Sequence, residues 1–350
     1  MKIAIIGNGG VGKALIRLLE NKGEKMAEEG LELVLIAHMD SSGTALDAGG
    51  ISLKQLIRHN EKNLPIKDFP QIGTAKAGVE EILKMQDLEV LIELTPTNKE
   101  TGEPGMTHIK RALEKGIHVI TANKGPILLA YHQLKELADK NNAQLWMGCT
   151  TGGALPSVNG GIMDMAGADI TSIEGVLNGT TNFILDEMKS SGCSYETALE
   201  KAQAAGIAET DPTLDVEGWD TATKLLILTN VLMKEEKKLS DIKVEGITKI
   251  TPADFKIAAE KDGKWKLVGR TEKNNSGLTM TVKPEILLPD HPLYGVDGKN
   301  KAVRYISDTL GDLTLAGGAS GLIPAAASVL RDLMNLHRGY RIPKEMRKSK

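Results

Sequence analysis

The stretch KIAIIGNGGVG, residues 2–12, decides the fold of this chain. Residues 2–6 are a short, β-rich apolar run, which predicts a buried strand. The glycines that follow form a G-x-G-x-x-G pattern directly before an amphipathic helix at residues 13–20. Gly7 permits a tight turn, Gly9 lets the backbone approach a pyrophosphate, and Gly12 allows close packing of helix on strand. This context favours a dinucleotide-binding loop over a glycine-rich turn without a ligand.

Strands and helices alternate along the first part of the chain. Further apolar runs at residues 31–37, 90–94, 118–121 and 143–147 predict strands, with helical segments between them. Alternation of this kind predicts a doubly wound parallel sheet, which is the Rossmann type of α/β fold. We expect it to form a dinucleotide-binding domain over residues 1–150.

The pattern changes near residue 150. Residues 148–161 are rich in glycine, threonine and proline, which marks a crossover to a second domain. Residues 151–309 combine helices with an alternating stretch at 264–284, which predicts antiparallel strands of the kind that often pair subunits. The second domain is therefore expected to be α+β, with catalysis and dimerisation as its roles.

The composition excludes several classes of protein. The chain has 350 residues, of which 41% are hydrophobic, 25% charged and only 3% aromatic, with a net charge of −3. These values are typical of a soluble globular protein and give neither a basic surface nor stacking rings for nucleic acid. No apolar run is long enough to span a bilayer, so we expect a cytoplasmic protein that binds no membrane.

Candidate cofactor contacts lie at the carboxyl ends of the predicted strands. Asp40 follows the second strand, where an acidic side chain would hold the adenosine ribose, but a turn-capping role fits it equally well. No arginine stands beside Asp40 to bind a 2′-phosphate, and NAD and NADP both stay open. Thr95, Pro96 and Lys124 follow two later strands, at the edge where such sheets bind ligands.

Residues 209–224, ETDPTLDVEGWDTATK, hold the densest group of charged side chains, with five acids and one lysine. Asp220 and Lys224 are four residues apart on a helix predicted to begin near Gly218, so they share a face and can pair. A surface ion pair is the simpler interpretation. The apolar run directly after Lys224 instead predicts a buried helix, and a buried lysine beside carboxylates is a candidate proton donor.

Cys149 lies near the expected substrate cleft, where a thiol could act as a nucleophile. No histidine is close to it in sequence, and free cysteine is more often a small buried residue. We therefore expect Cys149 to be inert.

Four separated segments resemble homoserine dehydrogenases. Residues 206–224 resemble the signature of that family, and residues 178–185 its substrate-side segment. Residues 121–124, and 317–319 with 328–333, match its pattern in the same order. The resemblance spans essentially the whole chain.

The resemblance implies NAD(P)-dependent, reversible reduction of L-aspartate 4-semialdehyde to L-homoserine, on the route to threonine, methionine and isoleucine. It implies a homodimer formed by the central sheet, and a nucleotide domain completed by residues 310–350. Lys224 would donate the proton, with Lys124 and Asp220 as further catalytic residues. The implied substrate-binding residues are Asn178, Thr180, Glu209, Asp215 and Asp220. The implied cofactor-binding residues are Gly7, Gly9, Gly10, Val11, Gly12, Asp40, Thr95, Pro96, Lys124, Gly206 and Gly318.

Two departures from the family pattern stand out. The family commonly binds a sodium ion through a loop that carries a glutamate, whereas this chain has Gly148 at that position. Backbone carbonyls of Thr151, Gly153 and Leu155 are the remaining candidate ligands. The chain also stops soon after its last predicted helix, so we expect a short form without a regulatory domain.

Two alternatives remain at this point. A different two-domain dehydrogenase of amino or hydroxy acids would make residues 209–224 a coincidence. A dinucleotide-binding regulator without catalysis would bind cofactor but turn nothing over. The intact set Lys124, Glu209, Asp220 and Lys224 favours the enzyme, since a sensor needs no proton donor.

Overall fold

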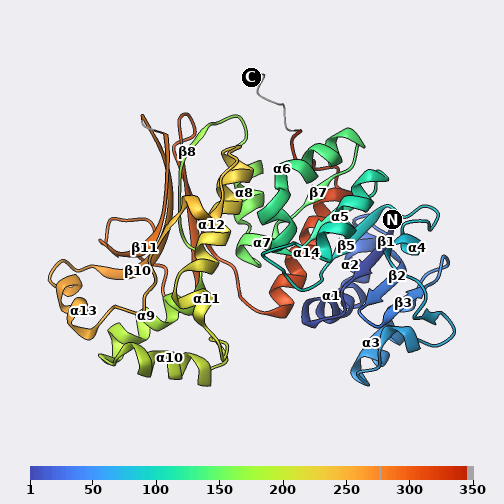
Figure 1. The fold of residues 1–350 in the computed structure, drawn as a ribbon, viewed down its shortest axis with the longest axis horizontal. Coiled ribbons are helices and arrows are strands. Elements are labelled where there is room, and N and C mark those ends of the chain that lie inside the picture. Colours follow the sequence, from blue (N-terminus) through green and yellow to red (C-terminus); the bar gives the residue numbers. More distant parts are fainter. Residues whose placement is uncertain (276, 345–350) are drawn as a thin grey trace. The chain divides into compact units, whose positions relative to one another are not determined.

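A seven-stranded sheet organises the first half of the chain (Figure 1). Its order is β4-β3-β2-β1-β5-β6-β7, and β1, β2, β5, β6 and β7 are parallel, with β3 and β4 antiparallel at one edge. The predicted doubly wound sheet is confirmed. The strands are β1 (Lys2–Ile6), β2 (Val34–Asp40), β3 (Gly43–Leu46), β4 (Gly73–Thr74), β5 (Val90–Glu93), β6 (His118–Thr121) and β7 (Leu145–Trp146).

The structure is a computed structural model that describes residues 1–275 and 277–344. The chain divides into one unit of residues 1–150 with the segment from Gly321 onward, and a second unit of residues 151–320. The helices of the first unit are α1 (Gly10–Asn21), α2 (Gly23–Glu28), α3 (Leu53–Glu61), α4 (Val79–Ile82), α5 (Gly105–Glu114), α6 (Lys124–Lys140) and α14 (Leu322–His337), with a 3-10 turn, η1 (Ile66–Asp68). Helix α7 (Cys149–Gly152) crosses the boundary between the units.

The central strands of the first sheet are buried on both faces. Residues 3–6 of β1 and 90–92 of β5 have no exposed surface. Near-continuous apolar strands of this kind are expected in a parallel sheet that helices cover on both sides. Helix α14 packs against α1, so the C-terminal segment completes the unit that the N-terminus begins.

A six-stranded sheet forms the second unit, in the order β13-β12-β8-β10-β11-β9. All its pairs are antiparallel except β9 with β11. The antiparallel strands predicted from the alternating stretch at 264–284 are confirmed as β10 and β11. The strands are β8 (Ile170–Val176), β9 (Lys243–Val244), β10 (Lys264–Asn274), β11 (Gly277–Leu287), β12 (Lys301–Ser307) and β13 (Asp312–Gly317).

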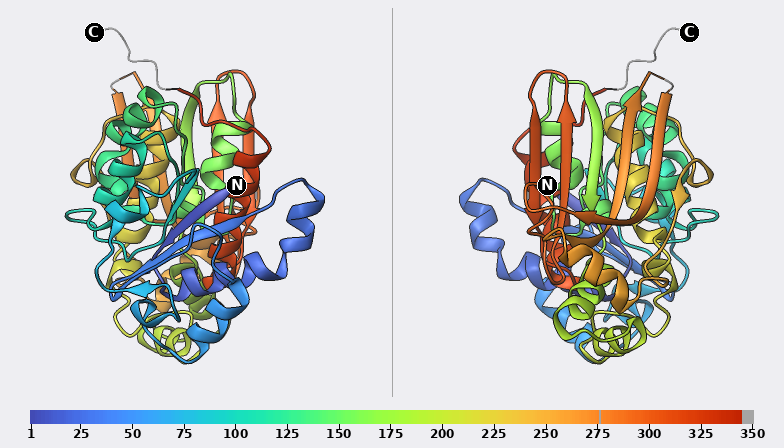
Figure 2. Two further views of the ribbon diagram at one scale, coloured as in Figure 1. Left: turned by 90° about the vertical axis from the view of Figure 1, so that its right-hand side faces the viewer. Right: turned by 90° about the vertical axis from the view of Figure 1, so that its left-hand side faces the viewer.

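Helix α12 is the central helix of the second unit. It packs against β8 and β10, and Gly269 of β10 lets it lie close, because a Cβ there would meet Thr221 at 3.1 Å. Figure 2 (right) shows the strands of this sheet in front, with α8 and α12 behind them. The helices are α8 (Ser157–Met163), α9 (Gly179–Ser191), α10 (Tyr195–Ala204), α11 (Thr213–Val216), α12 (Trp219–Leu232) and α13 (Pro252–Ala259), with a 3-10 turn, η2 (Leu239–Asp241).

One expected boundary is wrong in detail. Residues 310–320 were expected to join the first domain, but residues 312–317 form β13, which pairs with β12 along its length. That pairing satisfies the backbone groups of the β12 edge and keeps the segment in the second unit. The return to the first unit begins at Gly321. Among the described residues, no helix is long and apolar enough to cross a membrane.

Candidate active site

The glycine loop lines a cavity in the first unit that has a volume of about 820 Å³. The cavity opens at the carboxyl ends of β1, β2 and β5, where a doubly wound sheet binds its ligand. Of the predicted cofactor residues, it brings together Gly7, Gly9, Gly10, Val11, Asp40, Thr95 and Pro96. Its other lining residues are Ile6, Asn8, Met39, Ser41, Leu94, Thr97, Pro104, His108, Ala122 and Leu322.

The three signature glycines differ in what surrounds them. Gly7 has a φ of +112°, and a Cβ there would lie 2.6 Å from the backbone of Leu94. A Cβ on Gly12 would lie 2.1 Å from the carbonyl oxygen of Gly7, so Gly12 permits the close packing that the sequence predicted. Nothing lies within 4 Å of a Cβ on Gly9, which leaves the backbone there open toward the cavity. Helix α1 begins at the next residue and presents its N-terminal N–H groups.

Asp40 fits both of the roles expected for it, at the wall of the cavity and as a cap of the turn after β2. It is the last residue of β2 and lines the cavity. Its Oδ1 accepts hydrogen bonds from the backbone N–H and the hydroxyl of Ser42, at 2.7 and 2.5 Å, and its Oδ2 accepts one from the N–H of Ile66 at 3.3 Å. The carboxylate therefore shapes the turn after β2 and stays at the edge of the cavity.

Sequence reasoning missed Glu93, a fully buried carboxylate at the end of β5. Its Oε1 accepts from the backbone N–H of Thr95 at 3.0 Å and from the Thr95 hydroxyl, and its Oε2 lies 3.3 Å from the hydroxyl of Thr121. His108, which lines the cavity, places Nδ1 3.7 Å from Glu93 Oε1. A charged residue in an otherwise apolar strand was the available signal. Glu93 joins the loops after β5 and β6.

Lys124 begins α6, directly after β6. The preceding residue, Asn123, caps this helix by accepting from the N–H of Gly125 at 3.0 Å. Asn123 also donates to the Thr95 hydroxyl at 3.2 Å, and the N–H of Lys124 donates to the Thr97 hydroxyl at 3.4 Å. Lys124 is thus tied by its backbone to the loop that lines the cavity.

The charged pair predicted on one helix is present in the second unit. Lys224 Nζ lies 2.6 Å from Asp220 Oδ2 on α12, with 14% and 11% of the two side chains exposed. Lys224 Nζ also donates to the carbonyl oxygen of Leu177 at 2.8 Å. Both side chains are therefore mostly buried, which excludes the simpler interpretation of a solvated surface ion pair.

Asn178 connects the pair to a second carboxylate. Its Nδ2 donates to Asp220 Oδ2 at 2.9 Å and to Asp215 Oδ1 at 2.6 Å, while its Oδ1 caps α9 by accepting from the N–H of Thr181. The structure therefore brings together Asn178, Asp215, Asp220 and Lys224. Asp215 reaches the lysine through Asn178 and Asp220.

Three further predicted residues lie on neighbouring turns. The Thr180 hydroxyl donates to the carbonyl oxygen of Ile207 at 3.1 Å, which ties α9 to the turn after α10. Gly206 has a φ of +65° in that turn. Glu209 is exposed, and within the described part of the chain its side chain has no hydrogen bond or ion pair. The structure does not bring Glu209 into the cluster around Lys224.

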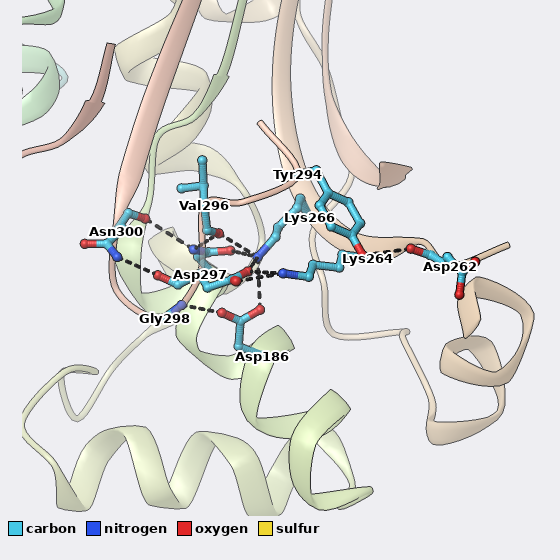
Figure 3. Close-up of polar contacts among 10 residues, drawn as sticks. Asp186, Asp262, Lys264, Lys266, Tyr294, Val296, Asp297, Gly298 and Asn300 are labelled. Atoms are coloured by element: carbon cyan, nitrogen blue, oxygen red, sulfur yellow. Dashed lines mark hydrogen bonds and ion pairs between the residues drawn. The ribbon is translucent and has the colours of Figure 1, made fainter. Parts of the chain in front are cut away.

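A fully buried lysine holds the segment opposite α9 (Figure 3). Lys266 Nζ donates to Asn182 Oδ1 and Asp186 Oδ1 of α9, both at 2.9 Å, and to the carbonyl oxygen of Val296 at 2.6 Å. It also lies 3.2 Å from Asp297 Oδ1. These contacts fix residues 296–300 against α9, the helix that Asn178 caps.

Cys149 and Gly318 each lie in close packing contacts. Cys149 is buried, and its Sγ lies 3.6 Å from the carbonyl oxygen of Ala325. Gly318, expected at the cofactor, has a φ of +73°, and a Cβ there would lie 2.3 Å from the backbone nitrogen of Leu155. It belongs to the second unit, where it lets the residues around 318 pack on the 151–155 loop.

The fold and these residues define the class: an NAD(P)-dependent oxidoreductase with a Rossmann unit and a second, antiparallel-sheet unit. The homoserine dehydrogenase family model matches residues 156–334, and the model "Homoserine dehydrogenase, NAD binding domain" matches residues 7–147. The chain belongs to the homoserine dehydrogenase family, as its sequence segments indicated. It uses NAD or NADP as cofactor.

Three known proteins illustrate the similarity. The homoserine dehydrogenase of Methanocaldococcus jannaschii is 38% identical over 96% of this chain and 98% of its own length. The NAD(+)-dependent homoserine dehydrogenase of Pseudomonas canavaninivorans is 34% identical, with 96% of each chain covered. A crystal structure of a putative homoserine dehydrogenase from Archaeoglobus fulgidus has a TM-score of 0.85 and 34% identity, and covers 96% of this chain and 99% of that one.

Proposed function

We propose that the protein interconverts L-homoserine and L-aspartate 4-semialdehyde with NAD(P), in the synthesis of threonine, methionine and isoleucine. The observation that carries the proposal is the contact of Lys224 with Asp220, supported by Asn178 and Asp215. Membership of the family supports the choice of substrate, and this cluster supports the proton transfer that the reaction requires.

Lys224 is the proposed proton donor. The nicotinamide, when bound, supplies or takes up the hydride. As charge develops on the aldehyde oxygen, the Lys224 ammonium gives it a proton, and in the oxidation of homoserine the neutral amine takes that proton back. Asp220 holds the ammonium in place through the 2.6 Å contact. Lys124, the first residue of α6 in the first unit, remains a further proposed catalytic residue.

Carboxylates suit the amino group of the substrate. Asp220 and Asp215 lie together here, joined by the side-chain amide of Asn178. Glu209 is exposed on the same stretch and is free to turn toward a bound ammonium group, so we keep it as a substrate-binding residue. Thr180 is the proposed lining residue on this side, and its hydroxyl is bonded to the turn after α10 through the Ile207 carbonyl. Gly206, in the same turn, remains a proposed cofactor contact.

The two units have separate proposed roles. The first would hold the dinucleotide on its glycine loop and on Asp40, Thr95 and Pro96, and the second would bind the substrate and form a homodimer through its antiparallel sheet. Sedimentation equilibrium checks the dimer, because a monomeric mass at assay concentration excludes it.

NAD is the proposed preferred cofactor. Asp40 stands at the end of β2 on the cavity wall, and no arginine lines the described cavity. A 2′-phosphate there would face a carboxylate, whereas a ribose hydroxyl would donate to it. Comparison of kcat/KM for the two dinucleotides tests this preference. Asp40→Asn keeps the shape of the turn residue and removes its charge, so it should shift the ratio toward NADP by about tenfold, as about 1.4 kcal/mol would.

The decisive experiment follows homoserine oxidation at alkaline pH with NAD and NADP in parallel. Lys224→Met should lose turnover by a factor of about 10² to 10⁴, the usual range for proton transfer, while dinucleotide binding is unchanged. Lys256→Met, at an exposed lysine of α13, is the matched control and should behave as the unaltered protein. If the unaltered protein binds the cofactor but does not oxidise homoserine, the proposed substrate is wrong.

A further inference from the structure

Lys301 carries a buried ammonium group into the loop of residues 151–155. It is the first residue of β12 and only 5% exposed. Its Nζ donates to the carbonyl oxygen of Gly152 at 2.7 Å. The position that a Cβ on Gly153 would take lies 3.6 Å from this nitrogen. The positive charge is therefore inside the loop rather than in solvent.

The loop around this ammonium is closed by its own hydrogen bonds. The Gly152 carbonyl also accepts from the N–H of Leu155 at 3.2 Å, and the Leu155 carbonyl accepts from the N–H of Ser157 at 2.8 Å. The Thr151 and Ser157 hydroxyls lie 2.7 Å apart. The 151–155 loop thus turns the Gly152 carbonyl oxygen toward the ammonium group of Lys301.

The residues present do not fit the sodium ion that the family resemblance implies. The candidate ligands are the backbone carbonyls of Thr151, Gly153 and Leu155 alone, because Gly148 has no side chain where the family pattern has a glutamate. In the described part of the chain, no group of three or more His, Cys, Asp or Glu could hold a metal ion. A metal ion in this loop would also stand beside the Lys301 ammonium, and two like charges in a buried site repel each other.

We propose that the Lys301 ammonium takes the place of a bound monovalent cation in this protein, whose stability and activity are then independent of sodium and potassium. The 296–300 segment, fixed to α9 by Lys266, delivers Lys301 to the loop. A glycine at position 148 fits this arrangement. The Lys301 ammonium supplies the positive charge that a metal ion would bring, and the Gly152 carbonyl accepts its hydrogen bond, so no carboxylate is needed.

The first test compares thermal unfolding of the whole protein in sodium, potassium and tetramethylammonium chloride at equal ionic strength. We expect the same midpoint in all three salts. A metal ion bound at about a hundred times its Kd would raise the midpoint by roughly 5 to 10 °C. A saturable rise of that kind, or saturable activation by sodium or potassium, overturns the proposal.

The second test removes the ammonium and keeps the length of the side chain. Lys301→Met should lower the unfolding midpoint and the turnover of homoserine, while Lys299→Met, two residues earlier and exposed, should change neither. If Lys301→Met has the same unfolding midpoint and the same turnover of homoserine as Lys299→Met, the proposal is contradicted. If Lys301→Met does not fold, the salt comparison on the unaltered protein decides. Only the turnover measurement rests on the proposed function, and the unfolding midpoints are independent of it.

Discussion

Nδ2 of Asn178 lies 2.9 Å from Oδ2 of Asp220, the same carboxylate oxygen that contacts the Lys224 ammonium at 2.6 Å. Asn178 lies at the start of α9 and Asp220 near the start of α12. One amide therefore fixes the direction of the carboxylate that holds the proposed proton donor. The relationship makes Asn178 a positioning residue.

Asn178→Ala should lower kcat for homoserine oxidation by roughly thirtyfold, as the loss of about 2 kcal/mol from a buried hydrogen bond predicts. Steady-state kinetics with saturating cofactor measures the change. Asn230→Ala is the matched control, because Asn230 binds the backbone of Lys237 at the other end of α12. The control should lose stability and keep its kcat. Equal losses of kcat in both variants would assign Asn178 a structural role only.

Two glycines of the same loop should respond in opposite ways to an added methyl group. Gly12→Ala places a Cβ 2.1 Å from the Gly7 carbonyl oxygen, so the free energy of unfolding should fall by about 3 kcal/mol. Gly9→Ala meets nothing within 4 Å, so its stability should be unchanged, but the methyl group blocks the approach of a pyrophosphate. Urea denaturation and calorimetric titration with NAD measure the two effects. Tight binding of NAD by Gly9→Ala would contradict the role given to this loop.

Glu93→Gln should weaken both the fold and the dinucleotide site. The neutral amide replaces one acceptor oxygen with a donor in a fully buried site, where Glu93 accepts from Thr95 and Thr121. We expect a loss of about 2 kcal/mol in unfolding free energy and a higher Kd for the dinucleotide. Glu114→Gln, at an exposed position of α5, controls for the charge change. If Glu93→Gln binds the dinucleotide with unchanged affinity, Glu93 has no role in the dinucleotide site.

His38 makes the stability of the protein depend on pH. It is fully buried in β2, and burial lowers the pKa of its imidazole from 6.5 to about 4, although Asp40 opposes the shift. The folded protein thus keeps His38 neutral, while the unfolded chain binds a proton below pH 6.5. Stability from this group is complete above pH 6.5 and falls by about 3 kcal/mol as the pH drops to 4.

His38→Leu removes this titration, so the difference in unfolding free energy between variant and unaltered protein should change by that amount across the same pH range. Urea denaturation at several pH values measures it. His337→Leu, at a partly exposed position of α14, controls for the replacement of an imidazole by leucine. A pH dependence that survives in His38→Leu would mean that other groups cause it.

Periodic and local signals explain what the sequence predicts well. The apolar run before the glycine loop, and the i, i+4 spacing of Asp220 and Lys224, are short-range patterns, and both are confirmed in the structure. The expected boundary at residue 310 is wrong because residues 312–317 pair with β12 in the second sheet. Whether such a segment joins a sheet or packs in the other unit depends on tertiary packing, which local sequence patterns do not encode.

The buried charges were not predictable in the same way. Lys266 and Lys301 stand in strand patterns where a lysine is expected to face solvent. Their partners are far away in sequence: Asp186 lies 80 residues from Lys266, and Gly152 lies 149 residues from Lys301. Only the fold brings such groups together, so a single sequence carries no spacing signal for them.

Leu322 sets the order in which the protein can become functional during its synthesis. Its side chain would meet a Cβ on Gly10 at 2.7 Å and lines the dinucleotide cavity, although more than 300 residues separate the two positions. A ribosome must therefore make the whole second unit before the first can close its cavity. A nascent chain that stalls before residue 322 holds the entire glycine loop and an unfinished binding site.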